Sequence, residues 1–366
     1  EMKSYSEFME YIKENVTDYL PERFEEAEIS IQQVVKNNDV VLDGLSIRNP
    51  DSNLSPNIYL NPLYEQYQKG RNLDELVSSI ADTYIENMEP IENRTFQVQI
   101  EDIKNYEVVK EEIFPRLVNL EKNTTRLQNV PYMQREDLAI TYHVKVSGNR
   151  DSIGSLMITN ELMEVYGVTK EKLHTQAMEN MERLSPPVFL PLGEMIVDVM
   201  TEDFGRNEGV SQEEAKEYVK DMIPTGGPNV YCLTNQYKMN GAVGIMSESI
   251  QQMVADRVGG DYYILPSSVH EVLIVPQSAG MDPEELTDMV NTVNEGCVMQ
   301  DEILSDHVYQ YDAKEHKLSL CAPAKEMKQE RTMEQNRQPA FEEKSIDATK
   351  QPEQSHEPIK HSGRSH

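Results

Sequence analysis

The sequence predicts an α+β protein (mixed α/β) in which strand-helix units build mixed sheets and a disordered C-terminal tail follows. Apolar residues recur at helical spacing in several segments, whereas short runs rich in Val, Ile and Tyr stand between turn residues, as strands do. Strands alternate irregularly with helices, and some strands form hairpins. Mixed sheets are therefore expected rather than one parallel sheet.

The first elements are a helix and a hairpin. Apolar residues within residues 1–20 form one helical stripe, and Pro21 ends that helix or follows it closely. Residues 29–47 predict two strands around the turn Asn37–Asp39, because Asn and Asp tolerate the left-handed backbone that such turns need.

A strand-helix unit then occurs in residues 58–88 and again in residues 156–184. In each, a short strand is followed by an Asn, a two-turn helix and a long helix. Asn72 and Thr169 are good N-caps for the two long helices. A partial third unit has Asp282 at its helix cap. Diverged repeats and chance similarity of capping residues both explain this pattern.

Further elements follow from periodicity and turn residues. Residues 138–148, "LAITYHVKVSG", alternate like a half-buried strand. The other expected elements are a short strand or loop anchor at 186–193, adjacent strands at 229–235 and 240–247, a helix at 248–258 and a final hairpin at 306–320.

The expected domain organisation has three parts. Residues 1–125 would form an N-terminal α/β domain and residues 126–321 a C-terminal α/β domain. Residues 322–366 are rich in Gln, Glu, Lys, Pro and Ser and poor in large apolar residues. Such a segment cannot bury enough apolar surface to offset its chain entropy, so a disordered polar tail is expected.

The charge is strongly acidic, with a formal net charge of −30. The tail carries eight basic and eight acidic residues, so the whole excess lies in residues 1–321. A surface this negative repels phosphate backbones and anionic lipid, which excludes nucleic acid and membrane as expected partners.

The cysteines and the N-terminus predict a cytoplasmic location. Cys232, Cys297 and Cys321 are far apart and odd in number, so they form neither a disulfide framework nor a metal knuckle. The N-terminus has no apolar signal core, and no apolar run has the length of a membrane-spanning helix.

Three stretches carry a resemblance to a known family. They are "FMEYIKENVTDYLPERFEEAEISIQQVVKNNDVVLDGLSIR", "IYLNPLYEQYQKG" and "YCLTNQYKMNGAVGIMSESIQQMVADRVGGDYYILPSSVHEVLIVP". Together they resemble domain-of-unknown-function family 5688 over about Tyr5 to Cys321. The resemblance implies an intracellular protein of an anaerobic Gram-positive bacterium. It implies no activity and no catalytic residues.

The densest group of polar candidates lies in "DYYILPSSVHEVLIVP", residues 261–276. As an enzyme site, Ser267 or Ser268 would be the nucleophile and His270 its base. On an extended strand Ser268 and His270 share a face, but Glu271 points to the other face and cannot orient the imidazole. We therefore favour a hairpin whose connection carries these polar residues.

Other motifs are weaker. Cys232 lies in a strand expected beside His270 and could act as a nucleophile, although buried strand cysteines are usually inert. Ser247 is better explained as a helix N-cap than as a nucleophile, and residues 223–229 as a loop than as a phosphate cradle. Asp203 and Asp221 are expected in acidic, loop-rich surroundings that lack calcium-loop spacing.

The sequence thus predicts a non-catalytic, cytoplasmic protein-binding or regulatory module with an unidentified protein partner. The alternative is a hydrolase-like enzyme that uses Cys232 or Ser268 with His270. No cofactor and no metal is expected, because the histidines show no ligand spacing. The oligomeric state stays open.

Overall fold

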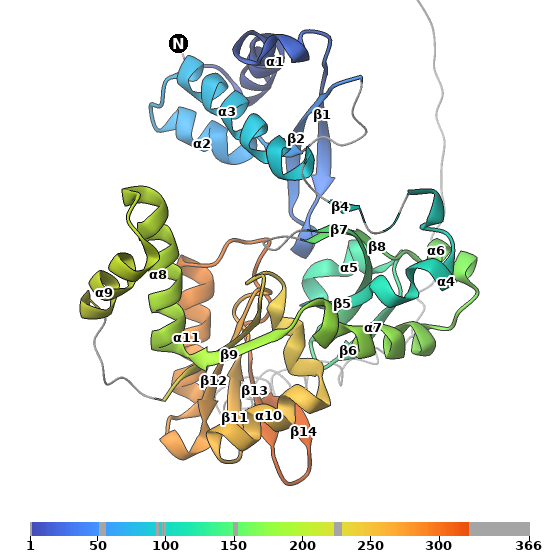
Figure 1. Cartoon of the computed structure of the whole chain (residues 1–366), viewed down its shortest axis with the longest axis vertical. Coiled ribbons are helices and arrows are strands. Elements are labelled where there is room, and N and C mark those ends of the chain that lie inside the picture. The colour runs from blue at the N-terminus through green and yellow to red at the C-terminus, as the bar shows by residue number, and fades with distance from the viewer. Residues whose placement is uncertain are drawn as a thin grey trace, which may run out of the picture. The chain divides into compact units, whose positions relative to one another are not determined.

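The computed structural model describes residues 2–50, 56–92, 95–96, 98, 100–148, 153–222 and 229–321 (Figure 1). Helices and strands alternate along this part of the chain, and the strands form three sheets. The α+β class is therefore confirmed. All strand pairs within these ranges are antiparallel, where the sequence suggested mixed strand directions. The predicted tail, residues 322–366, lies outside the described residues.

The N-terminal part contains the first sheet and three helices. Its elements are α1 (Tyr5–Asn15), β1 (Glu28–Val35), β2 (Val41–Arg48), β3 (Asn57–Tyr59), α2 (Asn61–Gln68) and α3 (Leu73–Glu92). The predicted hairpin is confirmed: β1 pairs with β2, and Asn38 in the turn has φ 61°. Asn72 caps α3 as predicted, because its side-chain oxygen accepts the Asp74 N–H at 2.9 Å.

A separate apolar cluster holds this part together. Residues from α1, the first sheet and the two following helices meet in it, and Phe8 at its centre is fully buried. The Phe8 ring lies 5.2 Å from the Tyr64 ring and 5.6 Å from the Tyr67 ring, centroid to centroid. Tyr84 is also fully buried, and its hydroxyl donates to the Ile47 carbonyl at 2.7 Å.

The second sheet is built around its longest strand, β7. Its strands are β4 (Thr95–Phe96), β5 (Ile113–Asn119), β6 (Tyr132–Arg135), β7 (Leu138–Gly148) and β8 (Ile153–Met157). The associated helices are α4 (Tyr106–Val109), α5 (Thr124–Leu127), α6 (Asn160–Tyr166) and α7 (Lys170–Leu184). Thr169 caps α7 as predicted, with its hydroxyl accepting the Lys172 N–H at 3.2 Å.

The prediction that β7 is half-buried is wrong. Ile140, Tyr142 and Val144 point into the main apolar cluster, as expected. The alternate residues Thr141 and His143 are also buried, at 1% and 3% exposure. Alternation shows which residues share a face, but burial of the polar face depends on segments that are distant in sequence.

The third sheet has the strand order β14-β13-β11-β12-β10-β9. Its strands are β9 (Pro187–Pro191), β10 (Tyr231–Asn235), β11 (Tyr262–Leu265), β12 (Val272–Pro276), β13 (Val308–Asp312) and β14 (Lys317–Cys321). The helices of this part are α8 (Leu192–Glu208), α9 (Gln212–Met222), α10 (Glu248–Val258) and α11 (Pro283–Gly296). Ser247 caps α10 and Asp282 caps α11, as predicted.

Short 3-10 helices occupy several connections. They span Val16–Tyr19, Glu22–Phe24, Asn37–Asp39, Ile100–Asp102, Lys110–Glu112, Glu121–Asn123, Gly241–Met246 and Gln277–Ala279. The strand expected at 240–247 is therefore wrong. Gly241 lies so close to β10 and to the His270 carbonyl that only a residue without a side chain fits there. The segment packs as a tight 3-10 turn instead.

The loops expected around Asp203 and Asp221 are also corrected, because these residues belong to α8 and α9. The apolar residues of "EMIVDVM" at the start of α8 follow one another too closely to form a single stripe. Periodicity therefore did not reveal the helix.

Residues Glu1–Pro323 form one compact unit. The predicted boundary at residue 125 stays a prediction, although β5 and β7, on either side of it, pair with each other. The β1–β2 turn is hydrogen-bonded to later parts of the chain. Asn37 Nδ2 donates to the Asp301 carbonyl at 2.9 Å, and the Asn38 N–H donates to Asn123 Oδ1 at 2.9 Å.

Candidate functional site

The stretch 261–276 forms the predicted β-hairpin: β11 and β12 pair antiparallel, from Tyr262 opposite Pro276 to Leu265 opposite Leu273. Ser268 lies in the connection and is 5% exposed. Its hydroxyl oxygen accepts the His270 backbone N–H at 3.0 Å. The contact between Ser268 and His270 is therefore the turn contact expected of a hairpin connection.

The His270 ring is held from two sides. Its Nδ1 accepts the Asn240 backbone N–H at 3.1 Å, and its Nε2 lies 3.3 Å from Glu302 Oε1. An Nδ1 that accepts a hydrogen bond carries no proton, so Nε2 carries it and donates to the carboxylate. Neither ring nitrogen is thus turned to Ser268 or Cys232 as a base would be.

Cys232 lies in β10, 3% exposed and opposite Leu273 of β12. Burial, aided by the Glu271 charge, raises the pKa of its thiol to about 12. A nucleophilic cysteine needs a lowered pKa, since the thiolate is the reactive form. Within the part of the chain that the structure describes, no hydrogen bond joins Cys232 to Ser268 or His270.

A second group of polar and charged side chains lies on one face of the second sheet. Phe114 and Arg116 of β5 lie opposite His143 and Thr141 of β7. The Thr141 hydroxyl and His143 Nε2 are 3.1 Å apart, and the Phe114 and His143 rings are 5.8 Å apart, centroid to centroid. Lys145 continues this row and is 8% exposed.

Arg116 is the most unusual member of this face. Its Nη2 donates to Ser155 Oγ at 2.9 Å, and its guanidinium carbon lies 5.5 Å from the centre of the Phe114 ring. Burial, with a smaller contribution from the Arg126 charge, lowers the pKa of Arg116 to about 10. The guanidinium therefore stays charged at neutral pH.

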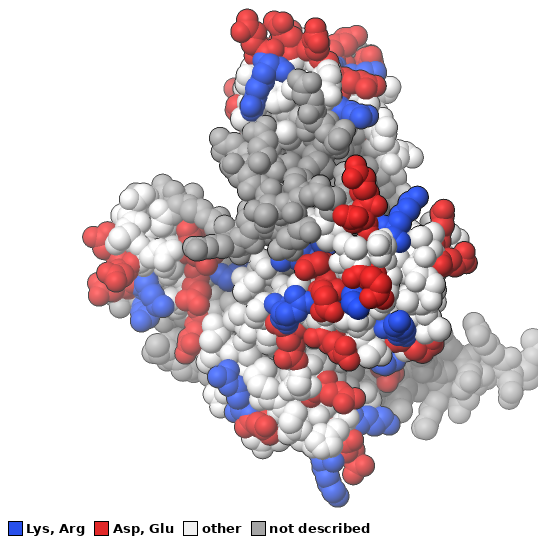
Figure 2. All heavy atoms as spheres, turned by 45° about the vertical axis from the view of Figure 1, so that its right-hand side comes forward, with Lys and Arg blue, Asp and Glu red and all other residues white. Residues whose placement is uncertain are grey.

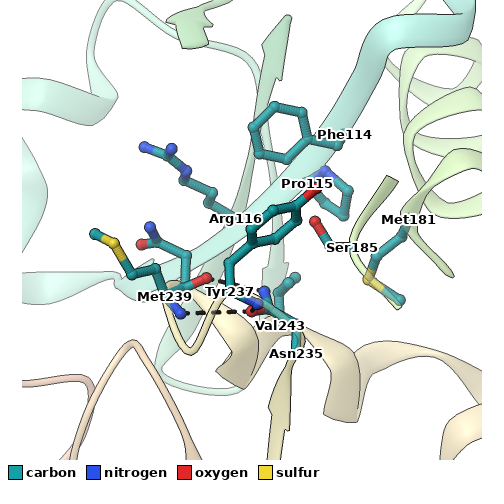
Figure 3. A pocket seen from close by; sticks show the side chains of 10 residues that line it. Phe114, Pro115, Arg116, Met181, Ser185, Asn235, Tyr237, Met239 and Val243 are labelled. Carbon is teal, nitrogen blue, oxygen red and sulfur yellow. Dashed lines mark hydrogen bonds between the residues drawn. The ribbon is translucent and has the colours of Figure 1, made fainter. Parts of the chain in front are cut away.

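A pocket lies between β5 and the loop that follows β10 (Figure 3). Asn235 shapes this loop, because its side-chain oxygen accepts the Tyr237 N–H at 3.0 Å and its amide donates to the Met239 carbonyl at 2.9 Å. In Figure 3 Tyr237 rises from the loop toward Pro115. The cavity measures about 50 Å³ and is lined by Phe114, Pro115, Arg116, Met181, Ser185, Asn235, Tyr237, Met239, Asn240 and Val243.

The buried histidine of this face predicts a pH dependence of stability. Burial first, and then the charges of Arg116 and Arg126, lower the pKa of His143 well below its usual value near 6.5. As the pH falls below about 6.5, His143 becomes protonated in the unfolded chain but stays neutral in the folded chain. The free energy of unfolding therefore drops by up to about 1.4 kcal/mol per pH unit.

We expect a His143→Gln variant to show a shallower decline in urea-unfolding free energy between about pH 7 and pH 5 than the wild type. Burial also lowers the pKa of His174, so part of the slope remains. His316→Gln, at an exposed position, is the control and should keep the wild-type slope. An unchanged slope in His143→Gln would contradict this account.

The helical hairpin α8–α9 presents a second kind of surface. Ile196, Val199 and Met200 are 41%, 40% and 38% exposed, and their spacing places them on one face of α8. On α9, Tyr218 is 56% exposed and its ring stacks on Phe204 at 4.9 Å. This surface, defined by Ile196, Val199, Met200, Val210 and Tyr218, is called the α8–α9 apolar face below.

The described ranges show neither a metal-binding cluster nor a membrane-spanning helix. They contain no group of three or more His, Cys, Asp or Glu side chains placed to hold a metal ion. None of their helices combines the length and the apolar character needed to cross a bilayer.

Sequence reasoning singled out neither Arg116 nor the α8–α9 apolar face. A signal for the first was present, since Arg116 interrupts the apolar run "IFPRLV" and a charged residue inside a buried strand is uncommon. The charge alone does not tell which side chains surround it. For α8, the signal was the crowding of apolar residues in "EMIVDVM", which puts apolar side chains both on the buried face and on the exposed face of a helix.

The fold and these surfaces define an antiparallel α+β protein with a polar strand face that carries Arg116 and a helical hairpin with exposed apolar side chains. The chain belongs to a family of unknown function, DUF5688, which matches residues 5–313. Searches of the curated proteins and of the solved structures found no match to the chain.

Proposed function

We propose that this protein is a non-catalytic, cytoplasmic binding module that docks a protein partner on the α8–α9 apolar face. The observation that carries the proposal is the exposed stripe of Ile196, Val199 and Met200 on α8. Apolar side chains scattered singly over a surface need no explanation, but a contiguous group on one helix face indicates an interaction site.

The charged residues on α8 and α9 indicate which kind of partner would be complementary to this face. The same two helices carry exposed acidic residues, Glu202 and Asp203 on α8 and Glu213, Glu214 and Glu217 on α9. A partner helix or strand with an apolar ridge and flanking Lys or Arg side chains is complementary to such a surface. Carboxylates are spread over the visible face of the molecule with basic side chains interspersed, which disfavours nucleic acid as the partner (Figure 2).

Two surface ion pairs join the two helices of the hairpin to each other and to a neighbouring loop. Lys216 Nζ and Asp198 Oδ1, 3.8 Å apart, join α9 to α8, and Lys238 Nζ and Glu202 Oε1, 2.8 Å apart, join α8 to the loop after β10. Binding is favoured over the hydrolase-like alternative because the Cys232 thiol is buried with a raised pKa and the His270 ring is engaged by Asn240 and Glu302.

A charge placed in the stripe tests the proposal. We expect Val199→Glu to weaken partner binding by at least about tenfold, because a carboxylate would have to be buried in an apolar contact. The matched control is Val165→Glu on α6, where the valine is also exposed, at 53% against 40% for Val199.

The measurement is affinity capture from the native cytoplasm, read by mass spectrometry, followed by titration of the captured protein against each purified variant. A partner bound equally well by Val199→Glu and Val165→Glu would contradict the proposal. Light scattering on the purified chain identifies the case in which the captured partner is a second copy. A chain that ends at Cys321 should keep the partner, because every residue of the apolar face precedes Cys321.

A further inference from the structure

Arg116 is a partly buried cation whose hydrogen-bonding capacity is only partly used. Its Nη2 donates to Ser155 Oγ, but its Nε is buried and has no hydrogen-bond partner in the part of the chain that the structure describes. Buried guanidinium groups are normally paired with carboxylates or phosphates, because an unpartnered buried donor has lost its water without replacement. An unpartnered donor therefore points to a missing acceptor.

The missing acceptor is not a neighbouring carboxylate. Arg116 forms no ion pair with any residue in the described ranges, and the charge that acts on it is the like charge of Arg126 on α5. Asp39 lies near Arg126, but its carboxylate oxygens accept the backbone N–H groups of Thr125 and Arg126. Positive charge is thus gathered here in a chain whose net charge is −30.

Arg116 also lines the pocket between β5 and the loop after β10. Its cavity of about 50 Å³ is large enough for a few waters or for one carboxylate or phosphate group. Ser185, Asn235 and Asn240 line the same pocket with polar groups. Figure 3 shows Phe114 and Tyr237 beside it, and their rings offer an apolar surface to the rest of a ligand.

We propose that Arg116 anchors a binding site for a small oxyanion, the carboxylate or phosphate group of a metabolite-sized ligand, in the pocket between β5 and the loop after β10. The planar fork of a guanidinium matches the paired oxygens of both groups, which a lysine ammonium does not. This inference rests on Arg116 and does not depend on the proposed protein partner.

The test uses the full chain and two simple probes, inorganic phosphate and acetate, with chloride at equal ionic strength as the reference. Thermal unfolding and isothermal calorimetry are measured for each salt. We expect the wild type to unfold at a higher temperature with phosphate, with acetate or with both than with chloride. A response to phosphate alone assigns a phosphoryl ligand, a response to acetate alone a carboxylate ligand, and a response to both the shared oxyanion chemistry.

Two substitutions identify the anchor. Arg116→Met should lose the response to the probe, and without any probe it should unfold at the same temperature as the wild type or higher, because a partly buried charge without an ion-pair partner has been removed. Arg116→Lys keeps the charge but loses the fork, so affinity should fall by about tenfold. It also keeps the test decisive if Arg116→Met folds poorly.

The matched control is Arg257→Met. Arg257 also places its guanidinium over a phenyl ring, 5.8 Å from the centre of Phe189, and its substitution makes the same change in net charge. It should respond to the probes as the wild type does. The proposal is overturned if the wild type responds to neither probe beyond chloride, or if Arg116→Met and Arg257→Met respond equally.

Discussion

A Gly241→Ala variant is expected to lose about 3 kcal/mol of unfolding free energy, because an added methyl group has no space at this position. The new Cβ would lie 2.5 Å from Thr234 Oγ1, 2.6 Å from the Asn235 nitrogen and 2.8 Å from the His270 carbonyl oxygen. Two of these atoms belong to the backbone, so no side-chain rotation relieves the overlap.

The control for this effect lies in the same 3-10 helix. A Cβ added at Gly244 would meet Ile250 Cδ1 at 3.6 Å and Leu233 Cδ2 at 4.0 Å, which are ordinary contacts. Gly244→Ala should therefore stay within about 1 kcal/mol of the wild type. Urea unfolding monitored by far-UV circular dichroism compares the three proteins, and equal midpoints for the two variants would refute the steric account.

A Phe8→Ala variant is expected to lose about 3–5 kcal/mol, since a fully buried aromatic side chain would be replaced by a cavity. The loss should be concentrated in the N-terminal part, because Phe8 packs on Tyr64 and Tyr67 within that separate cluster. Hydrogen exchange should accelerate in residues 5–48 and 57–88 more than in the third sheet.

Tyr19→Ala is the matched control, because Tyr19 is an aromatic residue of the same part that is 42% exposed. Its effect should stay within about 0.5 kcal/mol. Uniform acceleration of exchange across all three sheets in Phe8→Ala would show that residues 1–125 do not behave as a domain of their own. Acceleration confined to the N-terminal part would show a unit that ends after α3, before the predicted boundary at residue 125.

The features that could be predicted from the sequence are those that neighbouring residues decide. The caps Asn72, Thr169, Ser247 and Asp282 act within three residues of themselves, and the hairpin at 261–276 follows from two apolar runs and a polar connection. The order of strands in a sheet depends instead on long-range packing, so the exclusively antiparallel pairing of the described strands was not predicted.

The candidate sites likewise depend on residues that are distant in sequence and could be predicted only in part. Cys232 and His270 do lie on strands or connections of one sheet, as the sequence suggested. Which way the His270 ring faces is decided by Asn240 and Glu302, which are 30 and 32 positions away along the chain and carry no motif. The Arg116 site depends in turn on Ser155 and on a loop more than a hundred residues later, so its burial could not be read from β5 alone.

The turn at Asn37–Asp39 has a consequence for synthesis on the ribosome. The acceptors of the Asn37 and Asn38 side-chain amides, the carbonyls of Gln300, Asp301 and Ile303, are made more than 260 residues later. At roughly 5–20 residues per second the hairpin tip waits on the order of 13–50 s in water before these partners emerge. The side-chain amides of Asn37 and Asn38 stay hydrated during that delay, whereas an apolar tip would expose an aggregation-prone surface on every nascent chain.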